Sequence, residues 1–197
     1  MIIYCTKKMI ERYSLKMPHE LSDSLVREVA KKVVEREADD RLLEWGAKLF
    51  FLDGRKSLQI MNFASRLTVV LPDFKVEALP YLGNSIAERL FELFSDKPEM
   101  KPLLERFFEE HFAAVFSNLT DKGVISQLNR NQLDFFDSGW WRRFIRDNIF
   151  HSKEINRFLN YEHIVRRPGA KGWNMESHSY TAPEFERMLK ERCVKQA

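Results

Sequence analysis

The chain has 197 residues, of which 44% are hydrophobic and 31% are charged, a composition typical of a folded globular protein rather than a disordered one. No run approaches the roughly 20 apolar residues that a membrane span requires, so we predict no membrane association. The two cysteines, Cys5 and Cys193, stand at opposite ends of the chain. We expect both to be free thiols in a reducing compartment, which predicts a cytoplasmic protein.

The first forty residues predict a strand and two helices. Ile2–Cys5 is a short β-rich run, and Thr6 can cap a helical turn that follows it. A second helix is expected to begin at Ser22 or Ser24, after Pro18. Its apolar stripe lies opposite a charged face and consists of Leu25, Val26, Val29, Ala30, Val33 and Val34.

The next segment predicts strands. Two β-rich runs, residues 47–52 and 57–63, flank the Asp53-Gly54 pair, and Asp-Gly between such runs is the strongest short-range signal of a hairpin. Residues 67–71 supply a third strand that ends at Pro72. We therefore expect a three-stranded antiparallel meander.

The remainder of the chain predicts mainly helices, although residues 112–117 fit either a helix or a strand. The fold class expected from these patterns is α+β, with a small antiparallel β-meander near the N-terminus packed against several amphipathic helices. We expect one domain over residues 1–197. Its strand-rich part, with one long helix, spans residues 1–75, and its mostly helical part spans residues 76–197.

Four short segments resemble a family of uncharacterised bacterial proteins of unknown function. These segments are Cys5-Thr6-Lys7-Lys8, Trp45, the Arg55-Lys56 hairpin followed by Asn62, and the box from Thr120-Asp121-Lys122 to Leu128-Asn129. Lys122 stands where the family usually has arginine, and Ser126 where it usually has glycine. The resemblance implies no particular activity.

The polar residues of these segments lie at strand ends, in a hairpin and at a helix start. If the sheet brings them together, they form a net basic site, and backbone N–H groups after Thr6 would add partial positive charge for an anion. The candidate anion-binding residues are Thr6, Lys7, Lys8, Arg55, Lys56, Asn62, Thr120, Lys122 and Asn129. The competing interpretation is that the basic residues are ordinary solvated turn residues.

Basic residues are unevenly distributed along the chain. Residues 1–119 contain 18 Lys+Arg and 19 Asp+Glu, whereas residues 120–197 contain 14 and 10. Arginines are interspersed with tryptophans from Trp140 to Trp173, and such surfaces suit phosphate backbones and stacked bases. The candidate nucleic-acid-binding residues are Arg142, Arg143, Arg166, Arg167 and Lys171. Alternatively, the first two arginines are the solvated side of a helix whose other face packs into the core.

Catalytic signals are weak. Asp121 is the candidate acid, base or metal ligand, and Cys5 could be a nucleophile, although its place at the end of an apolar run favours a buried core residue. No phosphate-binding glycine loop is present, and the histidines lack metal-ligand spacing, so no cofactor or metal is predicted.

Three functions follow from these observations. The leading hypothesis is a protein that binds an anionic partner, a phosphate-bearing ligand or a nucleic acid, through basic turns. The alternatives are an enzyme acting on such a substrate and a subunit that contacts a protein partner or a second copy of itself. The enzyme hypothesis predicts that Thr6, Arg55, Asp121 and Asn129 converge on one cavity.

Overall fold

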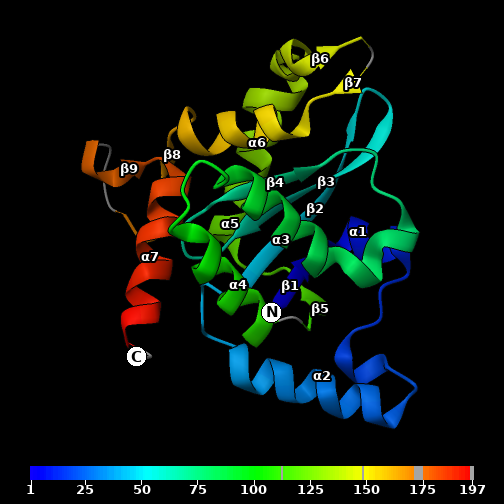
Figure 1. Ribbon diagram of the computed structural model, residues 1–197. Helices are drawn as coiled ribbons and strands as arrows, with labels where there is room; N and C mark the ends of the chain where they lie inside the picture. The colour runs from blue at the N-terminus through cyan, green and yellow to red at the C-terminus, as the bar shows by residue number, and fades with distance from the viewer. Residues whose placement is uncertain (112, 148, 171–174, 196–197) are drawn as a thin grey trace.

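The computed structural model describes residues 1–111, 113–147, 149–170 and 175–195. A five-stranded sheet with the strand order β4-β3-β2-β1-β5 forms its centre (Figure 1). The strands are β1 (Ile2–Cys5), β2 (Glu44–Leu52), β3 (Arg55–Asn62), β4 (Thr68–Leu71) and β5 (Val115–Asn118). Of residues 112–117, which fitted either a helix or a strand, residues 115–117 belong to β5, and residue 112 lies outside the described residues.

The sheet is mixed. Strands β2, β3 and β4 form the antiparallel meander predicted from Asp53-Gly54, but β1 lies parallel to both β2 and β5. The α+β class is confirmed, whereas the expectation of a small antiparallel sheet alone is wrong. The physical reason is that parallel neighbours require long crossover connections, which leave no local turn signal in the sequence.

Helices surround this sheet. The α-helices are α1 (Lys7–Tyr13), α2 (Ser24–Glu37), α3 (Leu82–Leu93), α4 (Met100–Glu110), α5 (Lys122–Asn131), α6 (Ser152–Tyr161) and α7 (Thr181–Lys195). Short helical segments are η1 (Pro18–Glu20), η2 (Val76–Tyr81), η3 (Gln132–Asp137), η4 (Trp140–Phe144) and η5 (Met175–Ser177). Two short ribbons pair β6 (Ile145–Arg146) with β7 (Ile149–Phe150) and β8 (Val165–Arg166) with β9 (His178–Ser179). None of the described helices is long and apolar enough to cross a membrane.

Each face of the sheet packs against its own group of helices. On one face, Trp45 belongs to the main core, which takes in apolar residues of α3, α4 and α7. On the other face, α5 covers Met61 and Phe63, while η3, η4 and α6 cover Phe50. Helix α5 approaches closely because β2 has a glycine there: a Cβ at Gly46 would lie 2.6 Å from Val124 Cγ1.

Two asparagines complete the hydrogen bonding of the edge strand β4. Asn160 Oδ1 accepts from Thr68 N at 2.8 Å, and its Nδ2 donates to Thr68 O at 2.7 Å. One turn earlier in α6, Asn156 makes the same pair of bonds with the backbone of Val70. The two side chains thus form the hydrogen bonds that a sixth strand would form and fix the backbone of β4 against α6.

Buried charges fix the start of β1 against α2 and α4. Glu37 is fully buried and contacts the Met1 ammonium at 2.5 Å and His111 Nδ1 at 2.9 Å. Burial raises the pKa of Glu37, but hydrogen bonds from His111, the Met1 ammonium and Arg36 outweigh it and leave the pKa at about 2.

Helix α2 uses only part of its apolar stripe. Ala30 and Val33 are buried against Ile2 and Val115, whereas Leu25 is 77% exposed and Val29 is 57% exposed. Figure 1 shows α2 below the sheet, apart from the helices that cover the two faces. The first half of this helix therefore has an apolar surface in contact with solvent.

Candidate functional site

The tip of the β2–β3 hairpin positions the residues of the candidate site. Asp53 and Gly54 have φ values of 51° and 73°, the left-handed conformation that a two-residue type I′ turn requires and that Asp-Gly favours. This turn places Arg55 and Lys56 at the start of β3, where Lys56 pairs with Phe51. Cavities lie on both sides of this hairpin, and Arg55 lines both of them.

The first cavity is an open groove of about 760 Å³ between the end of α1, the hairpin and the segment after β4. We call it the basic groove. Its charged lining residues are the cations Arg12, Arg55, Lys56 and Lys75 and the carboxylates Asp73 and Glu77. Four cations against two carboxylates leave a net charge of +2. None of the four cations forms an ion pair with another residue in the described part of the chain.

Aromatic residues line part of this groove. The rings of Tyr13 and Phe74 meet edge to face with centroids 6.3 Å apart, and the Tyr13 hydroxyl donates to Phe74 O at 3.5 Å. Burial raises the pKa of Tyr13, so its hydroxyl stays protonated at neutral pH. The backbone N–H of Phe74 donates to Lys56 O at 2.7 Å and ties the segment after β4 to the hairpin.

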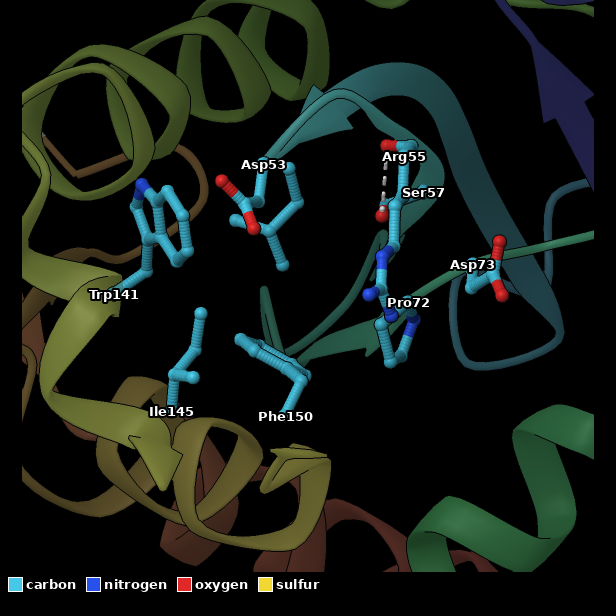
Figure 2. Close-up of a pocket in the computed structure, with 9 residues that line it drawn as sticks. Asp53, Arg55, Ser57, Pro72, Asp73, Trp141, Ile145 and Phe150 are labelled. Carbon is cyan, nitrogen blue, oxygen red and sulfur yellow. Dashed lines mark hydrogen bonds between the residues drawn. The ribbon is translucent and has the colours of Figure 1, made fainter. Parts of the chain in front are cut away.

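The second cavity, which we call the apolar pocket, has a volume of about 250 Å³. Its apolar walls are Leu52 of the hairpin, Pro72 after β4, Trp141 of η4 and the ribbon residues Ile145 and Phe150. Figure 2 shows the Asp53 side chain on the same side of the cavity as the hairpin, opposite Ile145 and Phe150. Ser57 is fully buried at the wall and donates to Arg55 O at 3.4 Å.

Asp121 lies in a different place, at the start of α5. Its Oδ1 accepts from Val124 N at 2.8 Å, as an N-cap residue does, and its Oδ2 accepts from Arg41 Nη2 at 2.6 Å. Burial raises the pKa of Asp121, but the hydrogen bonds from Arg41 and the Val124 amide outweigh it, and the net pKa is lowered. Both carboxylate oxygens are therefore engaged in a helix cap and an ion pair.

Beside this ion pair lies Arg66, which is 7% exposed and whose guanidinium forms no hydrogen bond or ion pair with the described residues. A Cβ at Gly123 would lie 3.1 Å from Arg66 Nη2. Burial lowers the pKa of Arg66, while the charge of Asp121 opposes that shift. Asn62 fixes the turn before Arg66, because its Oδ1 accepts from the backbone N–H of Ala64 and Ser65 at 3.1 Å each.

The remaining candidates at β1 and α5 lie elsewhere. Thr6 begins α1 and donates its backbone N–H to Ala47 O at 3.0 Å, and Lys8 lies over the ring of Phe51 at 5.4 Å. Asn129 accepts from Lys48 Nζ at 2.6 Å. Lys7 is 3.7 Å from Glu11, while Thr120 and Lys122 are exposed at the start of α5.

The structure thus places Arg55 and Lys56 in one groove, whereas the side chain of Asn62 is engaged in the turn before Arg66. No hydrogen bond or ion pair within the described ranges joins any two of Thr6, Arg55, Asp121 and Asn129, and the two cavities at the hairpin include only Arg55 of these four.

The arginines proposed to bind nucleic acid belong to two segments, η4, which precedes α6 in the chain, and the residues that follow α6. Arg143 lies 4.4 Å from the Trp140 ring and 4.6 Å from the Phe158 ring, and Arg142 lies 5.7 Å from Trp141. Arg166 and Arg167 follow the helix, and Arg166 Nη2 donates to Ala170 O at 2.8 Å. Lys171 lies outside the described residues.

Two further kinds of site were considered from the sequence, a nucleophilic cysteine and a metal site. Cys5 is 1% exposed, and burial raises the pKa of its thiol to about 12, so the thiolate required for attack is not formed at neutral pH. Across the described ranges, no group of three or more His, Cys, Asp or Glu side chains could hold a metal ion.

The sequence had indicated Arg55 and Lys56, but it gave no reason to join them with Arg12, Lys75 or Trp141 in one site. Arg12 lies in the last turn of α1 and Lys75 follows β4. Only the folded sheet brings these segments together, so no local pattern could have identified them.

Comparison with known proteins gives one finding. A family model described as a domain of unknown function, DUF6933, matches residues 2–176. No curated protein matches the chain. The match agrees with the resemblance to an uncharacterised family, whereas the bacterial origin and the individual motifs remain predictions.

Proposed function

The chain belongs to the DUF6933 family, and we propose that it binds a phosphate-bearing ligand in the basic groove. One observation carries this proposal. Cationic side chains from three separate segments line a single groove, and in the described part of the chain none of them is neutralised by an ion pair. Charged residues that serve only solubility are spread over a protein surface, whereas these four cations line one concave groove.

The chemistry of the four cations suits phosphate oxygens. Arg12 and Arg55 offer planar guanidinium groups that can donate two parallel hydrogen bonds to one phosphate, while Lys56 and Lys75 add compact charges. Asp73 and Glu77 repel an anion from their part of the groove and so restrict where a phosphate can lie. The polar groups of this groove are therefore suited to binding, and a reaction would require a further group.

The experiment that tests the proposal is calorimetric titration of the full chain with pyrophosphate. Opposite charges in water at 4 Å attract by about 1 kcal/mol, and more near a protein surface, so we expect Arg55→Ala and Lys75→Ala each to weaken binding about tenfold. Lys32→Ala, which removes an exposed lysine of α2, is the matched control and should change nothing.

Salt gives an independent check. Raising the ionic strength from 0.1 to 1 M shortens the Debye length from about 10 to about 3 Å, so affinity should fall steeply. Binding that is insensitive to salt and to both groove substitutions would refute the proposal.

A further inference from the structure

We infer that the ligand carries a flat ring with N–H groups as well as its phosphate, as a nucleotide does, and that the ring enters the apolar pocket while the phosphate lies in the basic groove. This inference rests on the proposed function and specifies the class of ligand.

The two cavities differ in size and in the charge of their lining, since Arg55 stands against Asp53 and Asp73 in the apolar pocket, a net charge of −1, whereas the basic groove has a net charge of +2. The basic groove, at about 760 Å³, is open and charged, and it can hold phosphates but offers little to enclose a ring. The apolar pocket, at about 250 Å³, is smaller than the sites of drug-sized ligands, which begin at roughly 300 Å³. It is larger than the cavity of roughly 150 Å³ that is known to hold benzene. One ring therefore fits the pocket, and the rest of the ligand must lie outside it.

The two cavities are also adjacent. Arg55 and Asp73 line both of them, and the bond from Phe74 N to Lys56 O holds the hairpin and the following segment together at this border. A ligand that crosses this border places its ring on one side and its phosphate on the other. Arg55 can then contact the phosphate from the boundary between them.

The walls of the apolar pocket favour a flat ring with polar edges. Trp141, Phe150 and Pro72 offer flat faces, and stacking of a base on an aromatic side chain contributes about 1–3 kcal/mol. The Asp53 carboxylate forms no hydrogen bond or ion pair with the residues that the structure describes, and Figure 2 shows it at the edge of the cavity. A carboxylate there accepts hydrogen bonds from ring N–H groups, which nucleobases supply and plain hydrocarbon rings do not.

The test compares four nucleoside 5′-diphosphates with pyrophosphate and with the free nucleosides, by calorimetry on the full chain. The diphosphate group is common to both charged probes, so any gain in affinity reports the nucleoside part, and differences among the four nucleotides report the ring. We expect at least one nucleoside diphosphate to bind ten times more tightly than pyrophosphate, and the free nucleosides to bind more weakly than either.

Two variants locate the ring. Asp53→Asn removes the charge but keeps a residue that tolerates the left-handed turn, and it should reduce nucleotide affinity about tenfold while leaving pyrophosphate unchanged. Ile145→Trp fills the apolar pocket and should abolish the advantage of nucleotides over pyrophosphate. If Ile145→Trp does not fold, the Asp53→Asn comparison alone decides the question.

The outcomes separate the two claims. If pyrophosphate binds and no nucleotide binds more tightly, the inference is overturned while the proposed function stands. The same holds if Asp53→Asn weakens pyrophosphate as much as nucleotides. If free nucleosides bind as well as nucleotides and pyrophosphate does not bind, or if no probe binds, both claims are overturned.

Discussion

The asparagines that take the place of a strand at the edge of the sheet lead to a quantitative prediction for Asn160→Leu. Leucine has the same branched arrangement of side-chain heavy atoms as asparagine, so the substitution removes the hydrogen bonds and keeps the shape of the side chain, although its two methyl groups are larger than the amide atoms. It leaves three buried groups without their partner: the N–H and C=O of Thr68 and the hydroxyl of Thr181, which donates to Asn160 Oδ1 at 2.6 Å.

The magnitude follows from these groups. Each buried polar group left unpaired costs about 1–3 kcal/mol, and the gain from burying a leucine offsets about 1.5–3 kcal/mol. We expect the free energy of unfolding to fall by about 3 kcal/mol, which corresponds to a decrease in Tm of about 10 °C for a chain of this size.

The assay is urea unfolding followed by circular dichroism, with thermal melting as a second measurement. Asn84→Leu, at an exposed position of α3, is the matched control and should change the free energy of unfolding by less than about 0.5 kcal/mol. A loss below about 1 kcal/mol for Asn160→Leu would refute the reasoning, because it would show that the backbone of β4 does not depend on this side chain.

Three further predictions concern buried groups. The lowered pKa of Glu37 stabilises the fold fully above pH 4.5, its ordinary pKa, and this stability is lost as the pH falls towards about 2. A Glu37→Gln variant should therefore have a lower free energy of unfolding at neutral pH, and that free energy should decline less steeply with acidification. If the free energy of unfolding falls equally steeply with pH in both proteins, the prediction is contradicted. In the native protein Cys193 should react with a thiol reagent and Cys5 only after unfolding, so two reactive thiols in the native state would be inconsistent with the structure. Arg66→Met should leave the free energy of unfolding unchanged or raise it, because it removes a buried guanidinium that forms no hydrogen bond or ion pair with the described residues, and a loss above about 1 kcal/mol in urea would argue otherwise.

The parts of the fold predicted from sequence are those that depend on local chemistry. Asp53-Gly54 identified the hairpin because its left-handed backbone conformation favours these residue types. The pairing of Ile2 with both Glu44 and Val115 has no such local signal, since parallel neighbours are joined by whole helices. The sequence therefore indicated the meander but not the two parallel strands.

The same distinction applies to the candidate site. Arg55 was predicted because it lies in the hairpin and belongs to a segment that resembles the family, whereas Arg12 and Lys75 belong to segments that meet it only in the folded protein. Asp121 and Asn62 stood out as polar residues at element ends, and the structure shows them in a helix cap and a turn, respectively. Polar side chains at such positions commonly form hydrogen bonds with the backbone, and only the contacts in the structure separate this role from ligand binding.

The most direct test of the central claim is to map the backbone amide shifts of the ¹⁵N-labelled chain while pyrophosphate is added. The account predicts that the largest changes occur at the end of α1, in residues 54–56 and in residues 73–77. Changes centred instead on the start of α5 or on Arg142 and Arg143, or no changes at all, would contradict it.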